Sequence, residues 1–250
     1  MSVLIYSKPL IINCLHTALT TTLTTLNDGA AGQAGGAGEG AEVVSSDNTD
    51  DKAGQAGAQK VIVEYLDVTG TPAYEEIIPN GTTAVALSVV AAWRYNDFYV
   101  SQFGSGKQNT GVLTLRKTSS GGNRITIAAK RKRAATGQFT VPLGYEFIYR
   151  GARFQASNSS TSAPLRVSVQ IEAEIDPHND GAYLDGVFTA IDFGVGGLGS
   201  QLQLGDLPEG FGIKIPSLAT IRAIGVVDSG TVELAGKIFG TLRRKPANMG

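Results

Sequence analysis

The stretch "LRVSVQIEAEI", residues 165–175, alternates apolar and polar side chains from its first residue to its last. Successive side chains of a β-strand point to opposite faces, so this period of two predicts a strand with one face in a core. Runs with strand character recur from residue 60 onward and are separated by turn-forming segments such as "DVTGTP", "SSGGN" and "DSG". The other runs span residues 60–66, 74–78, 83–93, 97–103, 111–117, 124–129, 138–142, 145–155, 186–193, 211–215, 219–227 and 231–242. Because no long amphipathic helix interrupts them, the sequence predicts an all-β protein of the β-sandwich or jelly-roll-like kind.

The composition agrees with such a fold. Hydrophobic residues make up 42% of the 250 residues, which is enough for a core, and 32 glycines suit a chain with many tight turns. The single cysteine, Cys14, excludes an internal disulfide framework, and we expect it to be a packed thiol rather than a nucleophile.

The chain shifts in composition along its length, and this shift suggests a domain organisation. Residues 27–58 contain eight Gly, eight Ala and six acidic residues, too little apolar surface to offset the entropy lost on ordering. We therefore expect a flexible Gly/Ala-rich linker there, forming an arm with the N-terminal peptide 1–26. That peptide would dock as an extended strand on a neighbour or form a short helix. The expected β-sandwich body covers residues 59–243, and 244–250 would be a tail.

The apolar start "MSVLIYSKPLIINCL" is interrupted by Lys8 and Pro9 and is too short to span a bilayer. It also lacks a clearly charged start and a convincing cleavage site for a signal peptide. We expect a soluble chain that is not exported and has no membrane partner.

Charge is segregated, although the chain carries a net charge of only -1. From Arg94 to Arg153 there are eleven Lys or Arg residues against Asp97 and Glu146. From Phe154 onward to residue 242, ten acidic residues face four basic ones. Opposite patches of this kind favour assembly, either between copies of the chain or between parts of one sandwich.

The densest basic segment is Lys130, Arg131, Lys132 and Arg133, between two strand-like runs. Consecutive residues of an extended chain alternate sides, so four cations in a row must lie in an exposed loop or at a sheet edge. Three interpretations stay open at this point. The segment is a solvated turn that discourages edge-to-edge aggregation, a contact for an acidic patch on a neighbouring subunit, or a weak contact for nucleic acid.

Aromatic residues concentrate in "WRYNDFYV", residues 93–100. On a regular strand Trp93, Tyr95 and Asp97 share one face, while Arg94, Asn96 and Phe98 share the other. Core packing is the favoured use of these rings. A sugar-binding platform built from Trp93 and Tyr95, or from Tyr145 and Tyr149, is the alternative.

The residues needed for catalysis are scarce. His16 and His178 are the two histidines, and no signature of a nucleophilic, zinc-dependent or nucleotide-hydrolysing enzyme appears. The segment "EIDPHNDG", residues 174–181, gathers oxygen ligands but misses calcium-loop spacing and is ordinary turn chemistry. The sequence therefore predicts no catalytic residues, no metal site and no cofactor, and an enzyme such as a depolymerase is the least favoured function.

Three segments share a pattern of strands and turns: "VEYLDVTGTPAYEEIIPNGTTAV" (63–85), "RYNDFYVSQFGSGKQNTGVLTLR" (94–116), and "ITIAA" with "QFTVPLGYEFIY" (125–129 and 138–149). These segments resemble virion structural proteins of tailed, marine-type bacteriophages. The resemblance covers about Val61 to Phe154 and rests on turns and strands rather than on catalytic motifs. The chain departs from that group at Lys130 to Arg133, where its segment is more basic.

The resemblance implies a non-enzymatic component present in many copies in a particle. Our primary hypothesis is a structural protein of a tailed-phage virion, in the capsid decoration, the neck or the tail. Its partners would be other copies of itself and the capsid, neck or tail proteins. We expect the protein to be located in the virion, which is assembled in the host cytoplasm. The alternative is a receptor- or carbohydrate-binding β-sandwich at a tail tip.

Overall fold

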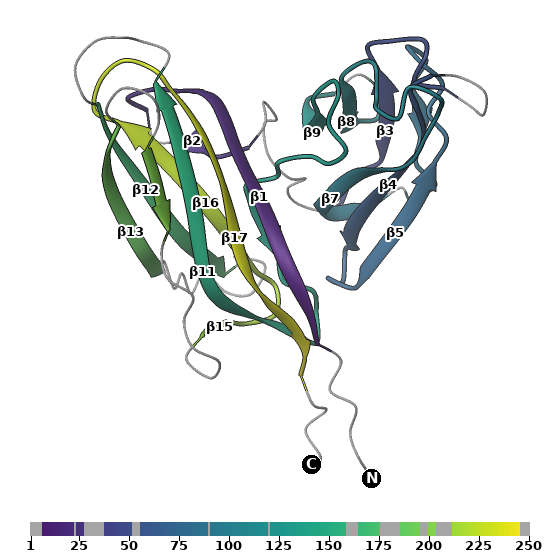
Figure 1. Ribbon diagram of the computed structural model, residues 1–250. Coiled ribbons are helices and arrows are strands. Elements are labelled where there is room, and N and C mark those ends of the chain that lie inside the picture. Colours follow the sequence, from purple (N-terminus) through teal and green to yellow (C-terminus); the bar gives the residue numbers. More distant parts are fainter. Residues whose placement is uncertain are drawn as a thin grey trace, which may run out of the picture. The chain divides into compact units, whose positions relative to one another are not determined.

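The computed structural model describes residues 7–22, 24–27, 38–51, 56–89, 91–119, 121–158, 165–175, 186–195, 200–203 and 212–245. Within those residues all regular secondary structure is β-strand, so the predicted all-β class is confirmed (Figure 1). The chain divides into two compact units. The first unit comprises Met1–Leu26 and Gly137–Gly250, and the inserted unit comprises Asn27–Thr136.

One sheet of the first unit is built on three long antiparallel strands, in the order β1 (Ser7–Leu19), β17 (Val232–Arg244) and β11 (Tyr145–Asn158). The far edge of β11 pairs with two short strands, β14 (Ser200–Gln203) and β15 (Ile213–Ile215). They follow one another along β11, so together they occupy the place of one strand.

The second sheet has the order β10 (Gln138–Thr140), β16 (Ala219–Val227), β12 (Leu165–Ile175) and β13 (Gly186–Val195). The short strand β2 (Thr24–Thr25) also pairs with β16. Strands β2 and β10 pair with consecutive parts of the same edge of β16. Thr24 and Thr25 pair with Gly225 and Ile224, and β10 pairs with Arg222 to Thr220. Segments β2 and β10 therefore form one composite strand.

The strand order of the first unit is that of a jelly roll. If β1, the composite β2/β10, β11, β12, β13, the composite β14/β15, β16 and β17 are lettered B to I, the sheets read B-I-D-G and C-H-E-F. This pair of antiparallel sheets is the jelly-roll arrangement. The inserted unit interrupts the C strand, between Leu26 and Gly137.

The two sheets of the first unit enclose a single hydrophobic core, which contains Phe147, Phe154, Leu234 and Ile238. The stretch "LRVSVQIEAEI" is β12, and its alternation is as predicted: Val167, Val169, Ile171 and Ala173 are buried, with polar neighbours between them. Each of the Val and Ile side chains contributes about 1.5–3 kcal/mol when it leaves water, which stabilises the strand with this face toward the core.

The inserted unit has its own core between two further sheets. One has the order β6 (Val85–Ala86), β3 (Ala41–Ser45), β8 (Leu113–Lys117) and β9 (Asn123–Ile127). The other has the order β5 (Pro72–Ile77), β4 (Ala58–Asp67) and β7 (Ala92–Phe103).

These boundaries differ from the expected single body at 59–243. The N-terminal peptide supplies β1, which pairs with β17 of the same chain rather than docking on a neighbour. The expected linker contains β3, and only 28–37 and 52–55 of it lie outside the described residues. Of the expected tail 244–250, Arg244 ends β17 and the Lys245 N–H donates to the Gly144 carbonyl oxygen at 2.9 Å. Alternation marks each strand locally but does not say which distant strand completes its sheet.

Candidate interaction surface

Three loops meet at one end of the inserted unit, and Asp50 joins two of them, the segment between β3 and β4 that contains it and the segment between β7 and β8. Asp50 has no exposed surface, and its carboxylate accepts four hydrogen bonds. The donors are the Ser45 hydroxyl (2.7 Å) and the backbone N–H groups of Ala58 (2.7 Å), Thr110 (2.8 Å) and Gly111 (2.7 Å). A carboxylate that is removed from water and saturated in this way stabilises the loops strongly.

Asn109 joins the second of these loops to the third. Its side-chain amide donates to the carbonyl oxygens of Gly111 (2.8 Å) and Ala128 (2.9 Å). The backbone carbonyl oxygen of Asn109 accepts from the N–H of Lys130 at 3.0 Å. Segments 104–111 and 128–132 are therefore neighbouring loops, held in a defined arrangement by a buried side chain.

The structure divides the basic segment into two parts. Arg133 turns back onto the inserted unit: its guanidinium forms a two-pronged ion pair with Asp97 and lies 5.3 Å from the centre of the Tyr99 ring. The hydrogen bond to Asp97 raises the pKa of Arg133 above its ordinary value. The Ala134 N–H donates to Phe98, and Val100 N–H donates to Lys132, so this segment lies along the edge of β7.

Lys130, Arg131 and Lys132 instead point to solvent. Lys107, on the adjacent loop, is exposed too, and both Lys107 and Lys130 have left-handed backbone conformations (φ 56° and 65°). Within the described part of the chain, no carboxylate lies within ion-pair distance of any of these side chains. We name Lys107, Lys130, Arg131 and Lys132 the cationic loop cluster.

Other cations of the basic middle region have partners inside the inserted unit. Arg116 pairs with Glu42 at 2.7 Å, and Arg124 pairs with Glu39 at 2.5 Å. The hydrogen bond from Arg124 to Glu39 raises the pKa of that guanidinium. Both glutamates come from the segment that the composition predicted to be a linker, so its acidic residues partly neutralise the basic strands.

Trp93 and Tyr95 do not form an exposed platform. They are 4% and 0% exposed, and the Arg94 guanidinium lies 4.7 Å from the centre of the Trp93 ring. The expected division of faces also differs, because Tyr95 and Phe98 are both fully buried. The cause is a register shift, in which Glu64 pairs with Asp97 but the next residue of β4 pairs with Tyr95. Asn96 is therefore an extra residue of β7 with no partner on β4, as in a β-bulge. Because of this extra residue, the side chains before and after it no longer alternate between the two faces of the sheet.

The other aromatic pair is also unsuited to stacking on a ligand. Tyr149 is 3% exposed and belongs to the core of the first unit, and Tyr145 is half-buried against that core. The favoured use of these rings, core packing, is therefore what the structure shows for Tyr95 and Tyr149.

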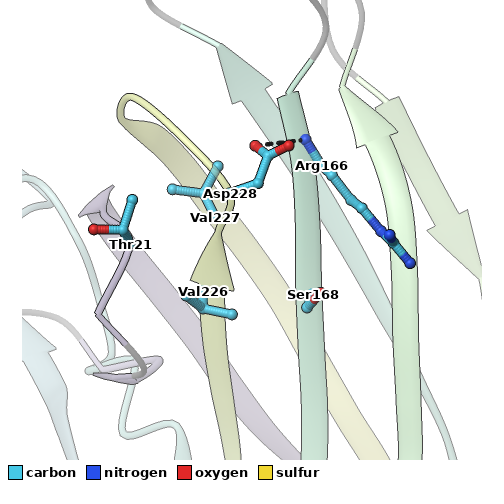
Figure 2. Close-up of a pocket in the computed structure, with 6 residues that line it drawn as sticks. All are labelled: Thr21, Arg166, Ser168, Val226, Val227 and Asp228. Carbon is cyan, nitrogen blue, oxygen red and sulfur yellow. Dashed lines mark hydrogen bonds between the residues drawn. The ribbon is translucent and has the colours of Figure 1, made fainter.

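The first unit carries an open surface depression of about 540 Å³ (Figure 2). Its lining residues are Thr21, Arg166, Ser168, Val226, Val227 and Asp228. The Asp228 carboxylate accepts from the Arg166 backbone N–H at 3.0 Å, so it closes the end of a strand pair. The Arg166 guanidinium extends away from Thr21 and Val226 (Figure 2). The depression brings no nucleophile and base together.

Among the residues that the structure describes, no group of three or more His, Cys, Asp or Glu side chains is placed to hold a metal ion. A helix long and apolar enough to cross a membrane does not occur among them either. The segment 174–181 lies outside the described residues from position 176 onward.

Sequence reasoning found the basic segment but missed Asp50, Asn109 and Lys107. The signal for Lys107 was its place in "GSGKQNTG", a glycine-rich turn between two strands. For Asp50 there was no usable signal, because its partners come from positions far apart in the sequence.

Comparison with known protein families found none that matches the chain, and no curated protein matches it either. Among solved structures, a chain in the structure of infectious bursal disease virus strain Gx shares 12% identity with a TM-score of 0.24. That alignment covers 98% of this chain and 74% of the viral chain. A TM-score this low is no basis for assigning a common fold.

Proposed function

We propose that this protein is a structural component of a tailed-phage virion, which assembles with copies of itself and with neighbouring capsid, neck or tail proteins. The observation that carries the proposal is the jelly-roll strand order of the first unit, with a second all-β unit inserted into its C strand. Jelly rolls are the building blocks of many viral capsid and lectin domains. The sequence resemblance over about Val61 to Phe154 favours the virion.

A jelly roll also occurs in sugar-binding and metal-dependent proteins, so the fold alone does not decide function. The described core of the first unit is filled by apolar side chains such as Phe147, Phe154 and Leu234, which supports a structural role. The carbohydrate-binding alternative loses the support of Trp93, Tyr95 and Tyr149, since all three are buried.

The β5 strand offers a surface for assembly. Tyr74 is 73% exposed and Ile78 is 54% exposed, on and just after a strand that pairs with β4 alone among the described elements. Val68, at the turn before this strand, is exposed as well. Large apolar side chains on an open sheet edge are typical of surfaces that another chain covers.

The direct test is quantitative mass spectrometry of purified particles of a phage whose genome encodes this protein. The native mass of the isolated chain should be measured in parallel at increasing concentration. We expect several copies per particle and concentration-dependent oligomers. The Tyr74→Ser substitution should weaken oligomerisation, whereas Leu143→Ser, which removes an exposed apolar residue from the first unit, should not. A chain that is absent from the particles and monomeric at high concentration would contradict the proposal.

A further inference from the structure

The cationic loop cluster combines high local charge with a fixed scaffold. Its four cations lie on two neighbouring loops, and none of them has an ion-pair partner in the part of the chain that the structure describes. Like charges held close together repel one another, so such a cluster costs free energy unless an anion neutralises it.

Arg133 shows by contrast what an internal role looks like. It comes directly after Lys132 in the sequence, yet it pairs with Asp97 and lies against Tyr99. The inserted unit thus supplies an ion-pair partner for one cation of the basic segment and, among the described residues, for none of the other three. If the basic segment were only a solvated turn, there would be no reason for a further exposed cation, Lys107, to lie beside it on a separate loop.

Hydrogen bonds fix the two loops of the cluster to each other and to the inserted unit. Asn109 binds both loops through its side-chain amide N–H groups and its backbone carbonyl oxygen, and the Asp50 carboxylate accepts from the N–H groups of Thr110 and Gly111. The two left-handed residues, Lys107 and Lys130, are cations themselves. Because the loops are already ordered, an anion that binds there does not have to order them first, which favours affinity.

The composition of the cluster favours phosphate over an acidic protein surface. Three of its four cations are lysines, which are depleted in protein–protein interfaces but act as point charges toward phosphate. Ser105, Gln108 and Thr110 are the exposed neighbours on the same loop, and polar side chains of these types donate hydrogen bonds to phosphate oxygens. Within the two loops as described there is no exposed aromatic ring, so stacking on unpaired bases is not provided for.

We propose that the cationic loop cluster binds the phosphate backbone of double-stranded DNA without reading its sequence. This inference goes beyond the proposed structural role and does not depend on where the protein lies in a particle. Up to four phosphates would be neutralised, which predicts a slope of about -3 to -4 for the logarithm of the binding constant against the logarithm of salt concentration. We expect dissociation constants of roughly 10⁻⁴ to 10⁻⁶ M at physiological salt, as for other non-specific binding.

The test is fluorescence anisotropy with the full chain and two unrelated labelled duplexes of about 25 base pairs, titrated from about 50 mM to 200 mM salt. The test variant carries Lys107→Gln, Lys130→Gln, Arg131→Gln and Lys132→Gln. The matched control carries Lys214→Gln, Lys237→Gln, Arg244→Gln and Lys245→Gln, which removes the same charge from exposed positions of the first unit. A double variant, Arg131→Gln with Lys132→Gln, leaves Lys107 and Lys130 with their left-handed backbone unchanged. A loss of affinity in this variant therefore cannot come from disturbing the backbone at those two residues.

We expect both duplexes to bind the wild-type chain equally. Affinity at about 50 mM salt should fall at least ~10-fold in the test variant, with a flatter salt slope, and about half as much in logarithmic terms in the double variant. Equal losses in the test and control variants would mean that net charge alone is responsible and would overturn the assignment to this cluster. Stronger binding of poly-glutamate than of duplex at the same salt would identify an acidic protein surface as the partner instead. Either negative result would leave the particle-composition test of the structural role unaffected.

Discussion

Leu26 and Gly137 hydrogen-bond to the same residue of β16, although the whole inserted unit separates them in the sequence. The Leu26 N–H donates to the carbonyl oxygen of Ala223, and the Ala223 N–H donates to the carbonyl oxygen of Gly137, both at 2.9 Å. The chain therefore leaves the C strand of the jelly roll and re-enters it at adjacent points. Insertions of this kind are tolerated because the two ends already lie where a short turn could join them.

Replacing residues 27–136 by a linker of about four Gly and Ser residues should leave the first unit folded, since β2 and β10 keep their pairing with β16. The isolated inserted unit should also fold, because it has its own core. Cooperative thermal unfolding by circular dichroism and dispersed amide spectra would verify both. A first unit that aggregates or unfolds non-cooperatively after the deletion would show that the two units depend on each other for folding.

The Asp50→Ala substitution should destabilise the inserted unit by about 3 kcal/mol or more, because it leaves several buried donors unsatisfied. Chemical denaturation that follows the inserted unit is the appropriate measurement. Glu76→Gln, which removes the same charge from an exposed pair with Lys60, serves as the control and should cost no more than about 1 kcal/mol. Equal effects of the two substitutions would contradict the role given to Asp50.

Gly236→Ala should destabilise the first unit. A Cβ at Gly236 would overlap the ring of Phe154 and lie 2.8 Å from the Arg153 carbonyl oxygen, and overpacking of this kind typically costs about 1–3 kcal/mol. Gly122 provides a comparison, because a Cβ there meets nothing within 4 Å and Gly122→Ala should be tolerated. Melting temperatures of the two variants decide the matter: an unchanged value for Gly236→Ala would show that β11 and β17 are less tightly packed than described.

Asp67 should make the β4–β5 turn sensitive to acid. Burial raises the pKa of its carboxyl, but hydrogen bonds from the Thr69 hydroxyl and from the Thr71, Thr69 and Gly70 backbone outweigh that effect, so the pKa lies below its ordinary value. A folded-state pKa below the unfolded value of about 3.9 gives stability that is present above that pH and lost as the pH falls. Asp67→Ala should therefore lower the free energy of unfolding at pH near 7 more than at pH near 2. An identical deficit at both pH values would rule out this linkage.

The periodicity of the sequence was sufficient to place most strands and the all-β class, because alternation of apolar and polar residues is a local property that each strand carries by itself. Val167 to Ala173 show this directly, since every second side chain of that segment is buried as its pattern predicts. The basic segment was also identifiable, because four consecutive cations cannot all face a core. What local patterns did not reveal was the use of the Gly/Ala-rich region, where β3 is stabilised by pairing with β8, far along the chain.

Tertiary structure alone decided which strands share a sheet, and with it the jelly-roll order, the interruption of the C strand and the division into two units. It also decided that Arg133, although exposed, pairs with Asp97, whereas Lys130 to Lys132 have no ion-pair partner among the described residues, and that Lys107 lies on the loop beside them. The physical reason is common to all of these outcomes. Strand pairing, a register shift such as that at Asn96, and a buried acceptor such as Asp50 depend on groups distant in sequence, and their free energy exists only once the chain has brought them together.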